Sequence, residues 1–424
     1  MHVCVLGAGI VGLATAWQLQ RDGFRVTVVD RAHAGAGASG ANGAQLSYSY
    51  VQPLADPAIW RQLPRLLLAT DSPLKLRPQL DLHQWRWGLR FLAACRASVS
   101  ARTTARLLAL AAESREGFGQ LLAEQPIDCD FAASGKLVLY PDAASLGAAV
   151  RQMHLQQAMG STQAALTPAQ CVAVEPALAH SHMRFAGGIH TPGECAADCF
   201  KVCQELLRLL RQRGVRFVFD TAVTRLVPEG GRVMAAESAA GALQADAFVV
   251  ALGTASHRLG SALGLDVPVY PLKGYSLTVE AHDTPGSAPR VSVTDAARKV
   301  VFARIGHRLR VAGMAELVGE STSIPAARIQ SLMATARDVF PKASTYEDAT
   351  AWSGLRPATP TGEPLTGRLP GSPSNLLFNT GHGALGFTLA FGSARRISAQ
   401  LQESGAARAA TGRRMVSPHQ EFTA

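Results

Sequence analysis

The sequence has few of the features that mark secreted, membrane-spanning or disordered proteins. Its 424 residues include only seven cysteines, an odd number whose spacing gives no disulfide framework. Charged residues make up 17% of the chain and apolar residues 47%, which predicts a globular protein of two domains. The apolar run from Val3 to Leu19 is too short and too rich in glycine to span a membrane, and no basic segment precedes it. We therefore expect a cytoplasmic protein.

Clusters of basic residues and of metal ligands are also missing. The net charge is +10, but lysine and arginine are scattered and the basic runs are pairs, such as Arg395–Arg396 and Arg413–Arg414. This pattern argues against nucleic acid and favours an anionic substrate or an anionic membrane surface. Cys195, Cys199 and Cys203 would share one face of a helix, yet no nearby His or Cys is spaced to be a fourth metal ligand. We expect no metal there, and small buried side chains instead.

A pattern typical of dinucleotide binding opens the chain. The apolar runs predict a strand, a helix and a second strand, over Val3–Leu6, Ile10–Leu19 and Arg25–Val29. Three glycines at fixed spacing fill the first turn: Gly7, Gly9 and Gly12. Gly23 suits the end of the helix, and the second strand delivers Asp30. Glycines at this spacing between a strand and a helix, followed by a second strand, are the fingerprint of dinucleotide binding.

Each residue of this turn has a physical task. Gly7 permits a sharp turn, Gly9 lets the backbone approach a pyrophosphate, and Gly12 lets the helix pack closely on the strands. The helix N-terminus adds free N–H groups and about half a positive charge for the phosphates. Asp30 can accept hydrogen bonds from ribose hydroxyls. This stretch alone does not distinguish NAD from FAD.

A second set of glycines with the same spacing lies near the C-terminus. A predicted strand, 375–378, and a predicted helix, 388–399, enclose Gly381, Gly383 and Gly386. A second helix N-terminus directed at the cofactor suits a reduced flavin, whose N1/C2 carbonyl edge becomes anionic, and NAD has no comparable need. Two such turns therefore favour FAD. The glycine-rich stretch 34–45 adds a loop that we expect to wrap the ligand with backbone groups.

The middle of the chain predicts further sheets. Short strands are expected at 136–140, 185–190, 215–219 and 247–251, a hairpin at 222–237, and alternating strands at 272–280, 300–304 and 308–313. The last three suggest an antiparallel sheet. Asp198 is a good cap for a helix that Gly214 closes.

Two other segments carry chemistry. Arg356 precedes Pro357 and follows Gly354 by two residues, so we expect extended or turn backbone and a rigid two-pronged donor for a carboxylate. A surface salt bridge is the alternative. Within the mainly helical region 55–125, the segment 83–96 interleaves aromatic residues with arginines. Such a helix can lie in a membrane interface, but it is more often the packed wall of a substrate domain, which we expect here.

Six segments together resemble the family of D-amino-acid, glycine and sarcosine oxidases, and within it the bacterial D-amino-acid dehydrogenases. The matching pieces are Val5–Gly12, Asn42–Gln45, Val269–Thr278, Gly313–Glu316, Gly354–Pro357 and Asn379–Gly386. They span nearly the whole chain in order. The resemblance implies a Rossmann-like α/β domain for FAD, made of residues 1–50, 195–265 and 350–424. It also implies an α+β substrate domain on an antiparallel sheet, made of residues 51–194 and 266–349.

The resemblance implies oxidation of D-amino acids to 2-oxo acids and ammonia, with electrons passed to a quinone or another respiratory acceptor at the inner membrane. The protein would then lie in the cytoplasm or on the cytoplasmic face of that membrane. We expect Arg356 to bind the substrate carboxylate, with Tyr50 or Tyr275 as a second donor, so that Cα–H lies over flavin N5. Lys273 either approaches the flavin or is a surface lysine.

The glycine motifs and the resemblance together assign a set of residues to FAD. These residues are Gly7, Ala8, Gly9, Ile10, Val11, Gly12, Asp30, Arg31, Ser39, Asn42, Gly43, Ala44, Gln45, Val223, Gly253, Gly381, His382, Gly383, Ala384, Leu385 and Gly386. His382 is expected to shape its turn and not to transfer protons. No cysteine follows Cys203, which excludes the late cysteine through which sarcosine oxidases can hold flavin, so we expect FAD to be non-covalent.

The sequence departs from the family pattern in three places, and other functions stay open. Residues 193–198 read Gly-Glu-Cys-Ala-Ala-Asp where the family tends to read Asp-Glu-Thr-Gly-Asp, Phe387 replaces a usual Trp, and the tail from Glu403 matches poorly. These departures affect the preferred substrate. The nearest alternative is an oxygen-dependent amine oxidase of glycine, sarcosine or a proline derivative. A flavin-dependent RNA-modifying enzyme and an inactive FAD-bound subunit are more distant alternatives.

Overall fold

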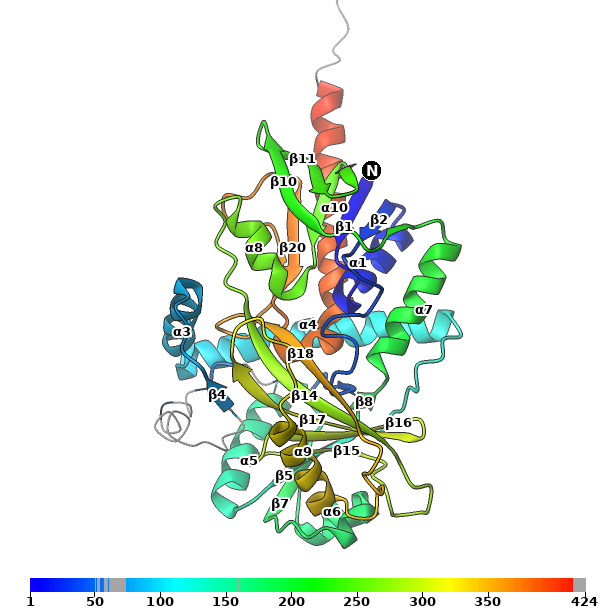
Figure 1. Cartoon of the computed structure of the whole chain (residues 1–424), viewed down its shortest axis with the longest axis vertical. Coiled ribbons are helices and arrows are strands. Elements are labelled where there is room, and N and C mark those ends of the chain that lie inside the picture. Colours follow the sequence, from blue (N-terminus) through cyan, green and yellow to red (C-terminus); the bar gives the residue numbers. More distant parts are fainter. Residues whose placement is uncertain (50, 52–53, 57–59, 61–73, 159, 415–424) are drawn as a thin grey trace, which may run out of the picture.

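The computed structural model describes residues 1–424 except 50, 52–53, 57–59, 61–73, 159 and 415–424. These residues form two large sheets with helices packed against them, which occupy the upper and lower halves of Figure 1. The mixed architecture confirms the predicted combination of an α/β cofactor-binding part and an α+β part with an antiparallel sheet.

The upper sheet has six strands in the order β19-β20-β13-β1-β2-β9. Its strands are β1 (His2–Leu6), β2 (Arg25–Val29), β9 (Arg216–Val218), β13 (Ala247–Val250), β19 (Leu365–Gly367) and β20 (Leu376–Thr380). All neighbouring strands are parallel except β19 with β20. Segments from the beginning, middle and end of the chain therefore have their carboxyl ends at one edge of the same sheet.

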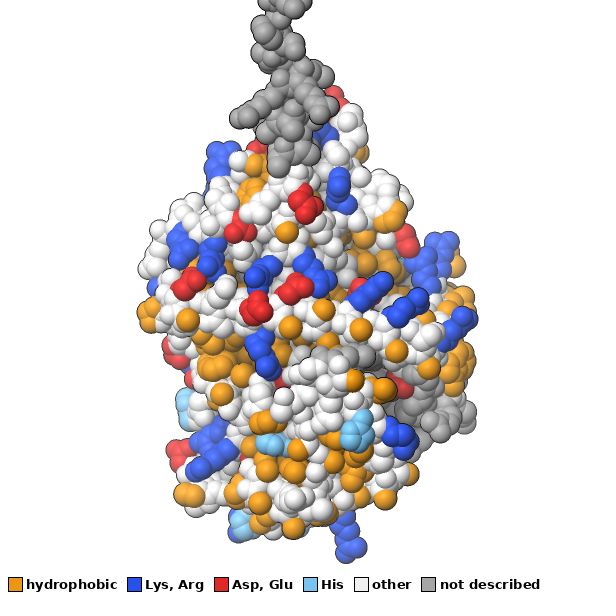
Figure 2. Space-filling model, turned by 180° about the vertical axis from the view of Figure 1, so that it is seen from behind, with side chains coloured by type: hydrophobic (Ala, Val, Ile, Leu, Met, Phe, Trp, Pro, Cys, Tyr) orange, Lys and Arg blue, Asp and Glu red, His pale blue; other side chains and the backbone are white. Residues whose placement is uncertain are grey.

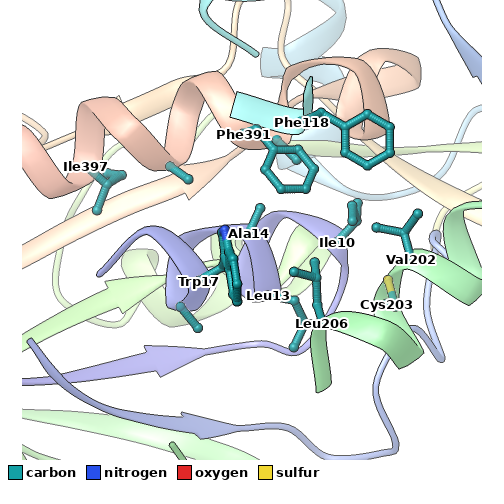
Figure 3. Close-up of a cluster of buried hydrophobic side chains, with 14 of the residues drawn as sticks. Ile10, Leu13, Ala14, Trp17, Phe118, Val202, Cys203, Leu206, Phe391 and Ile397 are labelled. Atoms are coloured by element: carbon teal, nitrogen blue, oxygen red, sulfur yellow. The ribbon is translucent and has the colours of Figure 1, made fainter. Parts of the chain in front are cut away.

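Helices cover one face of this sheet. They are α1 (Ile10–Arg21), α4 (Ala97–Glu124), α7 (Cys199–Gln212) and α10 (Gly386–Arg414). On β1, Val3 and Val5 point into this helical core and Cys4 points into the core on the opposite face, as the two-residue period of a strand requires. Figure 3 shows side chains of the four helices meeting around α1, among them Phe118 and Phe391.

The opposite face is covered by smaller elements. These are the three-stranded sheet of β10 (Val223–Glu229), β11 (Arg232–Ser238) and β12 (Gly241–Gln244), with the 3₁₀ turn η2 (Gly253–Ala255) and the short helix α8 (Ser256–Ser261). β10 and β11 form the predicted hairpin, which turns through Gly230 and Gly231, both with positive φ. The predicted cap is also confirmed, because Asp198 accepts hydrogen bonds from the N–H groups of Phe200 (3.0 Å) and Lys201 (3.3 Å) at the start of α7.

The lower sheet has nine strands, mostly antiparallel, in the order β18-β14-β17-β16-β15-β5-β7-β6, with β4 added beside β17. Its strands are β4 (Leu74–Leu76), β5 (Lys136–Tyr140), β6 (Ala164–Leu166), β7 (Gly187–Thr191), β14 (Tyr270–Glu280), β15 (Ser292–Asp295), β16 (Val300–Ile305), β17 (Arg308–Leu317) and β18 (Thr350–Ala358). The helical elements next to it are α5 (Ala143–Gln157), α6 (Pro168–Val174), η1 (Pro176–His180) and α9 (Ala326–Val339). The two-residue strands β3 (Gln45–Leu46) and β8 (Cys195–Ala196) pair with each other.

Two segments pack against the sheet of the other expected domain, and not against the sheet of the domain to which the sequence assigns them. Residues 350–358, assigned to the cofactor domain, form β18 and pair along their whole length with β14 of the nine-stranded sheet. Helix α4, assigned to the substrate domain, buries Leu107, Leu110 and Phe118 in the core of α1 and α10. Both placements result from long-range packing, which local sequence patterns do not reveal.

Helix α3 (Leu82–Ala94) lies at one edge of the molecule (Figure 1) and has two different faces. Trp87 is buried, and its indole N–H donates to the Ala358 carbonyl (2.8 Å), so one face is packed as expected. The other face leaves Leu82, Trp85 and Leu89 exposed by 74%, 52% and 68%. Among the helices that the structure describes, none is long and apolar enough to cross a membrane.

The cysteines are all free, and six of the seven are buried. Cys199 and Cys203 lie one turn apart in α7, but Cys195 lies in β8, because the helix begins only after its cap at Asp198. The expected common helical face of three cysteines is therefore wrong. In the described part of the chain no three His, Cys, Asp or Glu residues are arranged to hold a metal ion. On the surface seen in Figure 2, Lys and Arg are interspersed with Asp and Glu.

Candidate functional site

Four segments with predicted cofactor residues meet at one edge of the six-stranded sheet. β1, β2, β13 and β20 run in parallel, so the turns that follow them lie side by side. These turns contain Gly7, Asp30, Gly253 and Gly381, in the order of their strands. In open α/β sheets, ligands bind outside the carboxyl ends of the strands, so this edge is the candidate cofactor site.

Two glycines of the first turn are required by the packing of the chain itself. Gly7 has φ of +112°, and a Cβ atom there would lie 2.8 Å from the carbonyl carbon of Ala251 at the end of β13. A Cβ atom on Gly12 would lie 2.9 Å from the carbonyl carbon of Gly7. Real side chains do not reach backbone atoms this closely, so both positions exclude any larger residue.

Gly9 differs from both, because the protein leaves the space around it open. Its φ of −73° suits any residue, and a Cβ atom there would have only the Ser39 Oγ nearby, at 3.4 Å. Gly9 is the N-cap of α1 and offers no side-chain cap, and no acidic residue lies in the first turn. An open space beside a helix N-terminus fits a pyrophosphate, so the residues present fit FAD.

Asp30 closes this turn from the adjacent strand. Its Oδ2 accepts a hydrogen bond from the Ala8 N–H (2.6 Å), and its Oδ1 accepts one from the Ala32 N–H (3.0 Å). Each carboxylate oxygen can accept a second hydrogen bond, so Asp30 can also hold a ribose hydroxyl. The Thr221 N–H donates to the Asp30 carbonyl (2.9 Å), which holds the segment leading to Val223 at the start of β10 beside this site. The neighbouring Arg31 is exposed.

The glycine-rich loop 34–45, which we call the cofactor loop, connects this turn to the nine-stranded sheet. The Ser39 Oγ accepts a hydrogen bond from the N–H of Ile10, the first residue of α1 (3.0 Å). Further along, the Asn42 side chain accepts from the Ala44 N–H (3.0 Å), and Ala44 has φ of +59°. The Gln45 amide donates to the Phe302 carbonyl of β16 (3.3 Å).

Two side chains of the nine-stranded sheet hold the same loop from the other end. The Ser276 hydroxyl donates to the Ala41 carbonyl (2.7 Å), and Arg310 donates to the Asn42 carbonyl (2.9 Å). The loop is therefore fixed between the two sheets. Gly43 lets the loop lie close to the nine-stranded sheet, because a Cβ atom there would lie 3.1 Å from Val301 of β16.

The second glycine turn is buried at Gly381 and His382 and partly exposed from Gly383 to Gly386. Gly381 has φ of +81°, and a Cβ atom there would lie 2.6 Å from Thr359. Gly383 has φ of +56° with open space around it, and it begins the 3₁₀ turn η3 (Gly383–Leu385) that leads into α10 at Gly386. Ala384 is exposed at this turn. Gly253 at the adjacent strand end is similar, with φ of +58° and no atom near a Cβ position.

His382 is buried inside the second turn. Its Nε2 lies 3.1 Å from the Ser393 hydroxyl, and among the described residues its Nδ1 has no hydrogen-bond partner. Burial lowers the pKa of His382 to about 3, so the ring is neutral at physiological pH. A neutral, packed imidazole agrees with a role in shaping the turn.

Arg356 lies on β18, in the extended backbone that the following proline predicts. Its guanidinium lies over Gly274 of β14, where a Cβ atom would come within 2.5 Å of Nη1. Nη1 donates to the carbonyl of Met314 (2.8 Å), a residue with φ of +62° beside the register shift between β14 and β17. Such irregularities often lie next to functional sites. Burial lowers the pKa of Arg356 to about 10, so it is cationic at neutral pH.

Tyr275 and Lys273 lie on the opposite face of the sheet from Arg356. Along β14, Leu272 is paired with Arg356, so the side chains of residues 273 and 275 point to the other side. The Tyr275 hydroxyl donates to Glu316 (2.7 Å) in the core beneath α9. Lys273 is buried, not a surface lysine, and donates to the Ser323 carbonyl. Burial lowers the pKa of Lys273 and raises that of Tyr275. Tyr50 lies outside the described residues.

A buried network that no sequence pattern predicted lies next to the cofactor loop. The Glu194 carboxylate is 1% exposed and accepts hydrogen bonds from the N–H groups of Tyr48 (2.5 Å) and Ser49 (2.7 Å). The Lys136 ammonium donates to the Ser47 hydroxyl (2.9 Å). Burial lowers the pKa of Lys136 to about 8, partly opposed by the charge of Glu194. The only signal in the sequence was Glu194 itself, inside the segment that departs from the family pattern.

Comparisons with known proteins agree with this geometry. The family described as "FAD dependent oxidoreductase" matches residues 2–400. A "D-amino acid dehydrogenase 2" of Ralstonia nicotianae is 48% identical, covering 93% of this chain and 95% of the relative. One of the same name from Pseudomonas aeruginosa is 46% identical, covering 94% of each chain. The crystal structure of glycine oxidase from Bacillus cereus has a TM-score of 0.72 at 19% identity over 95% of each chain, which shows a shared fold.

The open space at Gly9 generates a test of the cofactor site. We expect Gly9→Ala to fold normally but to purify with much less FAD, because its methyl group takes the space of the pyrophosphate. Its affinity for FAD should fall by about tenfold or more, the equivalent of roughly 1.4 kcal/mol. The measurement is the 450 nm to 280 nm absorbance ratio, with a fluorescence titration of the apoprotein.

Two further glycines are the controls. Gly88→Ala in α3 should keep its FAD, because a Cβ atom there meets nothing within 4 Å. Gly12→Ala should lower the melting temperature of the apoprotein, because its methyl group meets the backbone of Gly7. A Gly9→Ala protein with full FAD content would show that the cofactor is bound elsewhere.

Proposed function

Because the chain belongs to the FAD dependent oxidoreductase family, we propose that it oxidises D-amino acids, such as D-alanine, to 2-oxo acids and ammonia. FAD is the cofactor of this family and is held here without a covalent bond. The proposal agrees with the relatives named D-amino acid dehydrogenase, which are 40–48% identical over nearly the whole chain. The observation that carries it is the guanidinium of Arg356. Within the described part of the chain it has a carbonyl partner but no carboxylate.

Arg356 binds the carboxylate of the substrate. Its planar fork can donate two parallel hydrogen bonds, and the partly buried setting strengthens the ion pair relative to water. Gly274 leaves the space that the guanidinium occupies, and the Met314 carbonyl fixes its orientation. The turns at Gly9 and Gly383 would hold FAD, which would supply the acceptor for the hydride of the substrate Cα. Arg356 contributes by holding the substrate in one orientation, and such positioning can supply much of the rate.

The sheet face supports the same role for Arg356. The same face carries Ser276 of β14 and Arg310 of β17, which hold the cofactor loop at Ala41 and Asn42. The residue that would bind the substrate and the residues that hold the cofactor loop therefore share one rigid surface. Tyr275 and Lys273, on the other face, have no part in the proposed reaction.

An anaerobic experiment tests the proposed function. The purified yellow protein is mixed with a panel of D- and L-amino acids, and its absorbance at 450 nm is followed. We expect D-alanine and other D-amino acids to bleach the flavin and L-amino acids to leave it yellow. A protein that stays yellow with every D-amino acid would contradict the proposal.

Oxygen consumption separates a dehydrogenase from an oxidase. We propose that the electrons pass to a quinone or a similar acceptor, as the family resemblance implies. The rate of turnover with an artificial electron acceptor should then greatly exceed the rate of hydrogen peroxide formation under air. Equal rates, with glycine or sarcosine as the better substrate, would favour the oxygen-dependent amine oxidase.

Substitution of Arg356 tests the binding site directly. Charge-assisted hydrogen bonds contribute about 1.5–3 kcal/mol each, so Arg356→Ala should lower kcat/KM for D-alanine by about 10²-fold or more. Arg356→Lys should recover little, because an ammonium cannot replace the fork. Both variants should keep their FAD. An Arg356→Ala enzyme with near-normal turnover would remove Arg356 from this role.

The exposed face of α3 supports a peripheral contact with the anionic cytoplasmic face of the inner membrane. We call this face, together with the segment before it, the α3 surface. Its apolar members are Leu80, Leu82, Trp85 and Leu89, and its basic members are Lys75, Arg77, Arg86 and Arg90. The helix itself contains no acidic residue, although Arg90 pairs with Asp266. Apolar and basic side chains on one exposed face are typical of a helix that lies in a membrane interface.

Vesicle binding tests this contact. We expect the protein to sediment with vesicles that contain anionic lipid and much less with neutral ones, since arginines add electrostatic attraction. The double substitution Trp85→Ser and Leu89→Ser should weaken binding by about tenfold or more, because two apolar side chains no longer enter the lipid. Leu155→Ser, at a leucine of α5 that is 60% exposed, is the control. Unchanged binding of the double variant would exclude the α3 surface.

A further inference from the structure

Trp352 lies on β18 between the cofactor loop and Arg356. It is two residues from Gly354 and four from Arg356, so all three face the same side of the sheet. Its partner on β14 is Ser276, which holds the Ala41 carbonyl of the cofactor loop. The indole Nε1 lies 3.4 Å from the position of a Cβ atom on Gly40 in that loop.

Two glycines form the floor on which Trp352 and Arg356 lie. The indole covers Gly354, where a Cβ atom would come within 2.7 Å of Cζ2 and 2.8 Å of Cζ3. The guanidinium of Arg356 covers Gly274 in the same way. Gly274 and Gly354 are direct partners across the two strands, and such partners have Cα atoms about 4.5–5.5 Å apart. The indole and the guanidinium are therefore neighbours on one surface.

This arrangement brings the indole within reach of a bound substrate. In an amino acid, Cα is bonded directly to the carboxylate carbon, so a carboxylate at Arg356 places the substituents of Cα beside the indole. The other paired residues around the glycine floor are Leu272 and Ser276, and the Ser276 hydroxyl already donates to Ala41. Among these paired residues of β14 and β18, Trp352 is the largest side chain beside Arg356.

We propose that Trp352 limits the size of the substrate side chain and directs the enzyme toward small D-amino acids. This inference rests on the proposed role of Arg356. The indole cannot rotate toward the sheet, because it already lies against the backbone at Gly354. A bulky substituent on Cα therefore meets the ring, and a methyl group does not.

Substitution of Trp352 tests the inference through a ratio of rates. We expect Trp352→Leu to raise the ratio of kcat/KM for D-phenylalanine to that for D-alanine by about tenfold or more, since steric fit in such pockets changes rates by this order. Trp352→Phe should give a smaller rise. Met234→Leu, at a side chain of β11 that is 48% exposed, is the control and should leave the ratio unchanged.

A second variant moves the indole without removing it. In Gly354→Ala the new methyl group occupies the position of the ring, so the indole must shift and the same ratio must change. A ratio within twofold of wild type in both Trp352→Leu and Gly354→Ala would overturn the inference. Loss of FAD from Trp352→Leu, read at 450 nm, would also overturn it, because Trp352 would then serve the cofactor loop.

The test distinguishes this inference from the proposed function. If Arg356→Ala keeps normal turnover of D-alanine, the proposed function fails and the role of Trp352 fails with it. If Arg356→Ala loses turnover and the two ratios stay constant, only the role of Trp352 fails. If Trp352→Leu does not fold, the ratio in Gly354→Ala and Trp352→Phe decides.

Discussion

The contact between the Gly7 turn, the first turn of α1 and the end of β13 is the constraint on which the rest of the structure depends. A Cβ atom at Gly7 or at Gly12 would meet backbone atoms, so the turn is built by backbone packed against backbone. That packing aims the N-terminus of α1 at the open space beside Gly9. Because β20 joins the same parallel sheet beside β13, the second glycine turn arrives at the same edge. Two distant parts of the chain thereby form one candidate cofactor site.

The cofactor loop connects the Gly7 turn to the nine-stranded sheet. Residues 34–45 are tied to α1 through Ser39, and to the nine-stranded sheet through Ser276 and Arg310. Arg356 and Trp352 lie on the same face of that sheet, over a floor of two glycines. The face of the sheet on which a side chain lies therefore decides whether it can lie beside Arg356. One residue along β14 separates Leu272, paired with Arg356, from Lys273, which is buried on the other side.

The network around Glu194 shows a further use of buried charge. Glu194 accepts hydrogen bonds from the N–H groups of Tyr48 and Ser49, and Lys136 donates one to the Ser47 hydroxyl. Residues 47–49, which follow the cofactor loop, are therefore held in place. The Ser47 N–H also donates to Thr388, in the first turn of α10 (3.2 Å). Breaking such a network leaves charges buried without partners, which is costly. The segment is thus held from the nine-stranded sheet, through Lys136, from Glu194, and from the start of α10.

Local patterns were sufficient to predict the elements of the candidate cofactor site. The spacing of Gly7, Gly9 and Gly12, the cap at Asp198 and the extended backbone before Pro357 all depend on a few neighbouring residues, and the structure confirms each. Tertiary structure alone decided that β18 joins the antiparallel sheet, that Tyr275 points away from Arg356, and that Lys136 and Glu194 lie beneath the loop. The physical reason is that backbone conformation follows from local sterics and hydrogen bonds. Strand register and the facing of side chains follow from contacts between residues far apart in the chain.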